Sequence, residues 1–242
     1  MSELSLSAVG LWRRYGERDV VRELWLEVHP GEVVGLLGPN GAGKTTTFNM
    51  IVGRVHPTRG KVHLGEQEIT ELPMYQRARM GITYLPQEPS IFRRLSVAKN
   101  VEAILETVEP DRSLRSERLA ELLSELGLAD KAHMRGDTLS GGERRRVEIT
   151  RALVLDPKFM LLDEPFSGID PIAVVDIQKI IGQLKERGIG IVVTDHNVRE
   201  TLAICDRAYI IKDGEIMREG IPAEIAADPR VREIYLGESF RL

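Results

Sequence analysis

Eight consecutive residues carry the first indication of chemistry. They are Gly38-Pro39-Asn40-Gly41-Ala42-Gly43-Lys44-Thr45, which match the spacing G-x-x-x-x-G-K-[ST] at every fixed position. Glycines here let backbone N–H groups surround a phosphate, and the N-terminus of a following helix adds partial positive charge. We expect Lys44 to reach the β- and γ-phosphates of a nucleotide and Thr45 to offer its hydroxyl to Mg²⁺. A glycine-rich turn without a ligand would have no need of this Lys-Thr pair.

A pair of carboxylates suits the same chemistry. Asp163 and Glu164 follow the apolar run Phe159–Leu162, and the C-terminal edge of such a strand is where α/β proteins bind ligands. Asp163 is suited to hold Mg²⁺, and Glu164 is suited to orient and deprotonate an attacking water. The alternative is a solvated acidic turn, which the phosphate loop in the same chain disfavours.

A second candidate anion site is the segment Leu139-Ser140-Gly141-Gly142-Glu143. Ser140 and Glu143 have capping-box spacing, so a helix is predicted to start here. A well-capped helix start is the simpler interpretation. The two glycines favour an anion site, because they are poor helix formers that expose backbone N–H groups at a helix N-terminus.

Strands and helices must bring these groups together. Short continuous apolar runs predict parallel strands covered on both faces, at Val33–Leu37, Ile82–Leu85, Phe159–Leu162 and Ile191–Val193. One helix is predicted at Thr46–Val52. Another is predicted after Asp170 as N-cap and Pro171 in the first turn, with apolar residues on one side at Val174, Ile177, Ile181 and Leu184. Strands that alternate with helices predict an α/β fold around a parallel sheet.

Other segments complete the expected architecture. Alternating residues predict half-buried antiparallel strands near the N-terminus, around Leu4, Leu6 and Ala8 and around Leu24, Leu26 and Val28. Asp213-Gly214 predicts a hairpin turn between Tyr209–Ile211 and Glu215–Met217. Residues 89–156 lack strand-like runs, and helices are expected at Val97–Leu105, Arg118–Leu126 and Glu143–Leu155. We therefore predict one domain, residues 1–242, with an α/β core over 1–88 and 157–242 and a helical insertion over about 89–156.

Composition excludes several classes of protein. The net charge of −4 does not suit non-specific nucleic-acid binding, so no nucleic-acid partner is expected. Cys205 is the only cysteine, which rules out an internal disulfide and a cysteine metal cluster and suits a reducing compartment. The first ten residues have neither the basic nor the apolar region of a signal peptide. No apolar run approaches the roughly 20 residues of a membrane span, so any membrane role would require a partner.

The three motifs, in this order, resemble the nucleotide-binding domain of ABC ATPases over essentially the whole chain. Leu139–Glu143 is the specific motif, because other phosphate-loop families lack it. The resemblance implies a RecA-like core that binds ATP and Mg²⁺ and hydrolyses ATP. Gln87 matches the family's Q-loop glutamine, His196 its switch histidine and Tyr15 the aromatic residue that stacks on adenine. Ser167–Asp170 matches the D-loop, with Gly168-Ile169 where Ala-Leu is commoner.

The resemblance also implies a role for each matched residue. Two copies would pair head to tail, so that ATP on one phosphate loop is covered by Ser140 and Gly142 of the other copy. Glu164, His196 and Gln87 would be catalytic. Thr45, Gln87 and Asp163 would hold Mg²⁺. The nucleotide would be bound by Tyr15, Gly38, Pro39, Asn40, Gly41, Ala42, Gly43, Lys44, Thr45, Thr46, Ser140, Gly141 and Gly142.

Ordinary structural roles are the alternative for Gln87, His196 and Tyr15. The run Arg144, Arg145 and Arg146 is interpreted as a solvated helix face without a catalytic role.

Two classes of ABC ATPase compete. Members that act on DNA or ribosomes usually carry long coiled coils or a second fused domain, and this chain shows neither. That favours a transporter ATPase with separate membrane subunits. Four segments are similar to the ATPase subunits of lipopolysaccharide export (Lpt) transporters of Gram-negative bacteria: Tyr84–Val97, Asp163–Ile172, Thr194–Thr201 and Tyr235–Leu242.

That similarity implies two transmembrane permease subunits and a cytoplasmic, peripheral location on the inner membrane. Phe92 would lie in the groove that receives a permease helix, with Arg93 and Arg94 at its rim. The alternative for Phe92 is a core anchor of the helical insertion. The rival family is the branched-chain amino acid importer ATPase, which shares a similar C-terminal tail but usually has an acidic residue in place of Gln87.

Overall fold

The computed structural model describes residues 4–238 and 240–241. Ser239 and Leu242 belong to Tyr235–Leu242, one of the segments similar to the Lpt ATPase subunits, and they lie outside the described residues. The strands are β1 (Leu6–Tyr15), β2 (Arg18–Val28), β3 (Val33–Leu37), β4 (Arg59–Leu64), β5 (Gln67–Glu68), β6 (Ile82–Leu85), β7 (Phe159–Asp163), β8 (Gly190–Thr194), β9 (Arg207–Lys212) and β10 (Glu215–Gly220). The helices are α1 (Lys44–Ile51), α2 (Met74–Arg79), α3 (Val97–Leu105), α4 (Arg112–Glu125), α5 (Gly141–Leu153), α6 (Pro171–Glu186), α7 (Val198–Leu202), α8 (Pro222–Ala227) and α9 (Pro229–Val231).

A six-stranded sheet in the order β10-β9-β3-β8-β7-β6 forms the centre of the described chain. Its neighbours from β9 to β6 are parallel, and β10 closes one edge as the antiparallel partner of β9. Every residue of β3, β7 and β8 is buried, as expected of strands covered on both faces. The predicted parallel strands and the hairpin at Asp213-Gly214 are confirmed.

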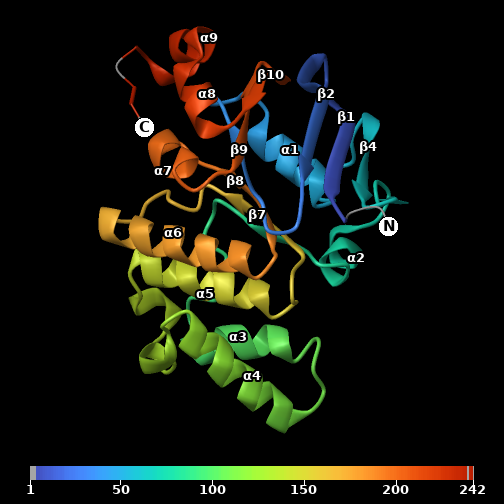
Figure 1. Cartoon of the computed structure of the whole chain (residues 1–242). Coiled ribbons are helices and arrows are strands. Elements are labelled where there is room, and N and C mark those ends of the chain that lie inside the picture. Colours follow the sequence, from blue (N-terminus) through green and yellow to red (C-terminus); the bar gives the residue numbers. More distant parts are fainter. Residues whose placement is uncertain (1–3, 239, 242) are drawn as a thin grey trace.

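A four-stranded sheet, β2-β1-β4-β5, lies beside this core. Figure 1 shows it flanking the blue helix α1, which contacts β1, β2 and β7. The predicted antiparallel pairing of β1 with β2 is confirmed. Sequence patterns did not predict β4, β5 or α2. These elements are short and partly exposed, so they lack a clear apolar period.

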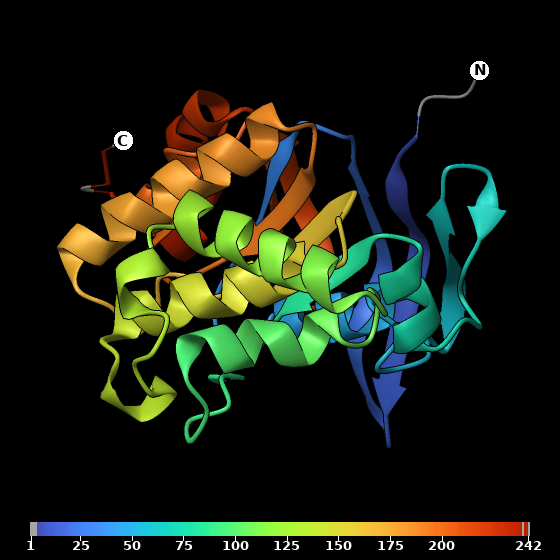
Figure 2. The same cartoon turned by 90° about the horizontal axis from the view of Figure 1, so that it is seen from below.

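The helices of residues 89–156 stack below the sheet, as Figures 1 and 2 show. α3 has the predicted bounds. α4 begins at Arg112 and not at Arg118, because Asp111 caps it by accepting hydrogen bonds from the N–H groups of Ser113 and Leu114. α5 begins at Gly141 and ends at Leu153, two residues earlier at each end than predicted. The Ser140 side chain sets that start.

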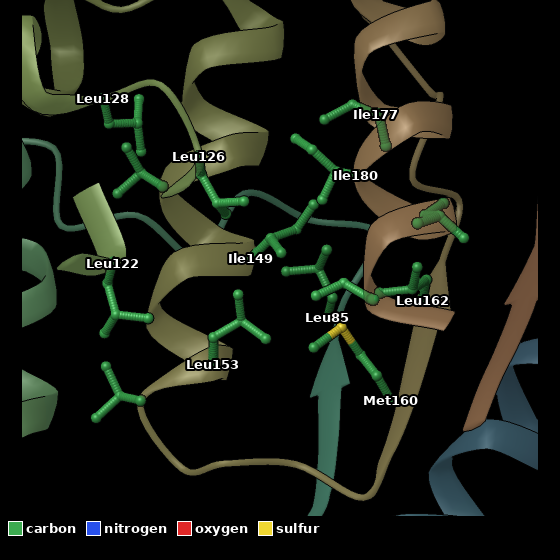
Figure 3. Packing of buried hydrophobic residues seen from close by; sticks show 14 of the residues in the cluster. Leu85, Leu122, Leu126, Leu128, Ile149, Leu153, Met160, Leu162, Ile177 and Ile180 are labelled. Atoms are coloured by element: carbon green, nitrogen blue, oxygen red, sulfur yellow. The ribbon is translucent and has the colours of Figure 1, made fainter. Parts of the chain in front are cut away.

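One apolar cluster links the sheet to these helices. Figure 3 shows Leu85, Met160 and Leu162 of the strands against Ile149 and Leu153 of α5, with side chains of α6 and α4 completing the layer. Burial of this cluster fixes α5, whose N-terminus carries the glycine pair, relative to the C-terminal edge of the sheet. α6 has the predicted start, with the Asp170 carboxylate accepting from Ala173 N–H. In the described residues, no helix combines the length and apolar character needed to cross a bilayer.

Candidate nucleotide and magnesium site

The predicted chemical groups converge at the C-terminal edge of the parallel sheet. The phosphate loop follows β3, Gln87 follows β6, Asp163 ends β7 and His196 follows β8. These strands are parallel neighbours in the order β3-β8-β7-β6, so their carboxyl ends meet. The result is a pocket of about 370 Å³, here called the nucleotide pocket. Its lining comprises Val20, Asn40, Gly41, Gly43, Lys44, Thr45, Thr46, Gln87, Glu164 and His196.

Two glycines of the phosphate loop are required by its shape. Gly43 has φ +111°, and a β-carbon there would lie 2.8 Å from the Val20 carbonyl oxygen. A β-carbon on Gly38 would lie 2.0 Å from the Ile211 carbonyl oxygen. The loop therefore fits tightly against β2 and β9 and delivers the chain directly into α1 at Lys44. An anion in the pocket would meet the N-terminus of that helix.

The Lys44 ammonium is held over the loop. Its Nζ donates hydrogen bonds to the carbonyl oxygens of Gly38 at 2.7 Å and Pro39 at 3.0 Å. Burial lowers the pKa of Lys44, and the carboxylates of Glu164, Asp163 and Asp195 oppose that change. The side chain is buried in the pocket wall, which is the position that contact with a bound phosphate requires.

The Asp163 carboxylate accepts a hydrogen bond through only one of its two oxygens in the described chain. It is 1% exposed, and its Oδ2 accepts from the Tyr84 hydroxyl at 3.0 Å. Within the described chain its buried Oδ1 has no hydrogen-bond partner. Burial raises the pKa of Asp163, and the Tyr84 and Thr45 hydroxyls oppose that rise. Thr45 follows Lys44 in the phosphate loop and lines the nucleotide pocket.

This donor set fits Mg²⁺. The ion prefers carboxylate and hydroxyl oxygens and binds through one or two carboxylates plus substrate phosphates. An orphaned carboxylate oxygen beside a Thr hydroxyl and a phosphate loop meets that description. Gln87, the third expected ligand, lines the same pocket, but its amide donates to Glu164 and not to Asp163.

Glu164 lies between two of the predicted catalytic residues. Its Oε1 is 2.7 Å from His196 Nε2, and its Oε2 accepts from Gln87 Nε2 at 2.8 Å. Its backbone is left-handed, with φ +50°, a conformation that costs roughly 1–2 kcal/mol for an L-residue. Burial raises the pKa of Glu164, while His196 opposes that rise. Strain and a raised carboxylate pKa are typical of catalytic positions.

The expected nucleotide contacts at the start of α5 are not part of the nucleotide pocket lining; they are Ser140, Gly141 and Gly142. Ser140 caps α5, since its hydroxyl accepts from Glu143 N–H while the Glu143 carboxylate accepts from Ser140 N–H at 2.8 Å. Ser140 and Gly142 line a different hollow, beside Asp170 and Ala173. A β-carbon on Gly142 would lie 2.5 Å from that of Ala173, so close packing on α6 requires glycine there.

Tyr15 is also outside the nucleotide pocket. It is 46% exposed, and its ring lies 4.6 Å from the Arg13 guanidinium. Phe92, the expected permease contact, is 44% exposed and lies 4.4 Å from the Arg151 guanidinium. That exposure weighs against its alternative role as a core anchor.

The interpretation of Arg145 as part of a solvated face is wrong. Its side chain is buried, and it donates to the carbonyl oxygens of Pro86 and Asp163, each at 2.9 Å. It also pairs with Glu148 at 3.2 Å. Three consecutive residues on a helix point in different directions, so one member of the run faces the sheet.

Two further residues of the site were missed. Tyr84 holds Asp163, as described above. Asp195 is fully buried and accepts from the N–H groups of Phe166 at 2.8 Å and Asn197 at 2.9 Å, which ties together the segments that follow β7 and β8. Asp195 follows the apolar run Ile191–Val193, so the signal that identified Asp163 could also have found it.

Comparisons with known proteins agree with this chemistry. The family model described as ABC transporter matches residues 21–167, and one described as branched-chain amino acid ATP-binding cassette transporter matches residues 219–241. A relative from Acidithiobacillus ferridurans, named lipopolysaccharide export system ATP-binding protein LptB, is 58% identical over 100% of both chains. The protein of that name from Escherichia coli strain K12 is 53% identical over 98% of this chain and 99% of its own.

Solved structures share the fold. A nucleotide-free ATP-binding cassette from an ABC transporter superposes with a TM-score of 0.88 at 26% identity, over 97% of this chain and 100% of the other. An ATP-binding cassette in a dimeric post-hydrolysis state, bound to ADP and Pi, superposes with a TM-score of 0.78 at 26% identity, over 90% and 98%.

Proposed function

The chain belongs to the ABC transporter family as an ATPase, and from this premise we propose that it powers the export of lipopolysaccharide from the inner membrane. Full-length similarity to proteins named for that system carries the proposal, at 58% identity in one species and 53% in another. It is supported by the nucleotide pocket, where the phosphate loop meets Glu164, and by Asp163, which directly precedes Glu164 at the end of β7.

We propose the following division of labour in hydrolysis. The phosphate loop and Lys44 bind the phosphates of ATP, and Asp163 and Thr45 would hold Mg²⁺, with Gln87 as a further ligand by family resemblance. When bound, Mg²⁺ neutralises charge on the transferred phosphoryl group. The oxygen of the attacking water bonds to the γ-phosphorus while the bond from that phosphorus to ADP breaks. Glu164 accepts the proton that the water gives up. His196 orients Glu164 and contacts the γ-phosphate.

We further propose that two copies pair head to tail. Ser140, Gly141 and Gly142 lie outside the nucleotide pocket of their own chain, so within one copy the second candidate anion site has no phosphate to bind. In a symmetric pair, Ser140 and Gly142 of each copy would cover ATP held by the other, with Tyr15 stacked on its adenine. Closure would exclude water and add donors to the developing charge. The dimeric, ADP-bound cassette of similar fold supports this arrangement.

The proposed partners are two transmembrane permease subunits of the Lpt type. Phe92 is exposed beside Arg151 and would contact a permease helix, with Arg93 and Arg94 nearby. The chain would then sit on the cytoplasmic face of the inner membrane as a peripheral subunit. In Phe92→Ala, ATPase activity of the isolated chain should persist while assembly with the permeases is lost. Global unfolding of that variant would favour a core role for Phe92.

The importer alternative rests on one observation, the match of residues 219–241 to a branched-chain amino acid transporter model. Purification of the full chain from native membranes in mild detergent, with mass spectrometry of its partners, separates the two. Two polytopic permeases with bound lipopolysaccharide are the expected result. A permease with a periplasmic amino-acid-binding protein would contradict the export proposal. Recovery of ribosomes or DNA without a membrane protein would contradict transport altogether.

A further inference from the structure

We propose that Tyr84 is a positioning residue of the magnesium site, whose hydroxyl fixes the Asp163 carboxylate so that one oxygen stays free for the ion. The inference rests on the proposed role of Asp163 as a Mg²⁺ ligand. Tyr84 lies on β6, the neighbour of β7, and pairs in register with Leu161, two residues before Asp163. Its hydroxyl donates to Oδ2 at 3.0 Å.

The hydrogen bond makes the two carboxylate oxygens different. A carboxylate turns about a soft torsion, so without a partner its two oxygens exchange positions. Asp163 is 1% exposed and cannot rely on bulk water to hold it. Tyr84 occupies Oδ2, and in the described chain Oδ1 has no partner. The carboxylate is thus held at one oxygen and available at the other. An outer hydrogen-bond partner of this kind orients a metal-binding side chain before the ion arrives.

Tyr84 itself is held by the helix that carries the other proposed ligand. Its ring meets Phe48 edge-on, with centroids 6.5 Å apart and an interplanar angle of 78°. Phe48 lies on α1, one turn after Thr45, and is fully buried. The Arg54 guanidinium lies 5.9 Å from the ring. Tyr84 therefore contacts both α1 and β7, the elements that carry Thr45 and Asp163.

The variant Tyr84→Phe isolates the hydroxyl, because the ring and its contact with Phe48 remain. In the Glu164→Gln background, which prevents turnover, we would measure binding of a fluorescent ATP analogue first in EDTA and then during a Mg²⁺ titration. Mn²⁺ binding followed by electron paramagnetic resonance gives a second readout that does not depend on activity. Loss of a residue that orients a metal ligand costs about 10–100-fold in metal affinity. We expect the Mg²⁺ and Mn²⁺ midpoints to rise by about tenfold, with binding in EDTA unchanged.

Tyr209→Phe is the matched control. Tyr209 also lies on a strand of the six-stranded sheet, but its hydroxyl accepts a hydrogen bond from Arg207, whereas that of Tyr84 donates to Asp163. It should leave the metal midpoints unchanged. An unchanged midpoint in Tyr84→Phe would overturn the inference. Equal weakening in EDTA and in Mg²⁺ would also overturn it, because the hydroxyl would then act on nucleotide binding as a whole.

Asp163→Asn separates failure of this inference from failure of the proposed function. If Asp163→Asn raises the metal midpoint and Tyr84→Phe does not, Asp163 is a ligand that needs no positioning by Tyr84. If neither variant raises it, Asp163 is not the ligand, and the proposed metal site fails together with the inference.

Discussion

Two hollows of this molecule differ in a way that volume does not reveal. The nucleotide pocket has about 370 Å³, whereas a hollow lined by residues of β1, β2, β9 and β10 has about 860 Å³. The larger one, here called the outer hollow, is lined by residues that include Trp12, Arg22, Trp25, Arg207 and Glu219.

Both arginines that line the outer hollow are already paired. Arg207 donates to Glu32 at 2.9 Å and to Glu219 at 2.6 Å, and Arg22 donates to the Asp213 carbonyl oxygen at 2.7 Å. Next to the nucleotide pocket, the buried Asp163 Oδ1 lacks a partner among the described residues. A left-handed backbone does not distinguish the two regions, because Glu164 and also Glu23, which lines the outer hollow, have one. A buried carboxylate oxygen without a hydrogen-bond partner, placed beside a phosphate loop, is an exception that a bound ion would explain. We therefore expect the reaction to take place at the nucleotide pocket and not in the larger outer hollow.

Among the variants that compare the two regions, Glu164→Gln should cause the largest loss of ATP hydrolysis. Removing the proposed general base should lower ATP hydrolysis by about 10²–10⁴-fold, while the amide keeps a group of the same shape between Gln87 and His196. Phosphate release measures the rate, and equilibrium ATP binding serves as the control, which should stay near wild type. Wild-type turnover in this variant would show that Glu164 is not the base.

Lys44→Ala should act on nucleotide binding itself. A charged hydrogen bond contributes about 1.5–3 kcal/mol, so ATP affinity should fall by roughly 10–100-fold. Isothermal calorimetry measures the affinity, and circular dichroism checks that the fold is retained. Unchanged affinity would contradict the assignment of the phosphate loop.

Arg207→Met tests the outer hollow as a structural region. Loss of its hydrogen bonds to Glu32 and Glu219 leaves carboxylates without their cation, which should cost about 1–3 kcal/mol of folding free energy. For a chain of this size that lowers Tm by about 2–4 °C per kcal/mol. ATP affinity and the rate per folded molecule should not change. A specific loss of hydrolysis at full stability would place function in the outer hollow.

The smallest effect is expected for Trp25→Ala. Trp25 is 55% exposed in the outer hollow, and exposed positions usually change stability by about 0.5 kcal/mol or less. Hydrolysis and Tm should both remain close to wild type. If export by the assembled transporter were lost while both values held, the outer hollow would be a partner surface and not only a structural region.

The sequence predicted the parts of the fold that depend on local pattern. Apolar runs such as Val33–Leu37 and caps such as Asp170 and Ser140 act within a few residues, and the structure confirms them. The start of α4 was missed because its first turns are polar and exposed, so they carry no apolar period.

Local sequence patterns could not predict contacts between segments that are distant in the chain. The hydrogen bond from Tyr84 to Asp163 and the burial of Arg145 depend on which strands and helices become neighbours. The left-handed backbone of Glu164 is likewise set by tertiary contacts, including the hydrogen bond from its N–H to the Thr194 carbonyl oxygen. Local propensity gives no signal for contacts of this kind.

We propose that each nucleotide pocket is half of a site that a second copy completes. The most direct test mixes Lys44→Ala, which lacks a working phosphate loop, with Ser140→Arg, which blocks the second anion site. Each variant alone should be inactive. Only a mixed dimer joins an intact phosphate loop to an intact Ser140, and it does so at one of its two sites. The mixture should therefore recover up to about one quarter of wild-type hydrolysis, because about half of the symmetric pairs are mixed. Activity no greater than the sum of the two separate variants would contradict a shared site.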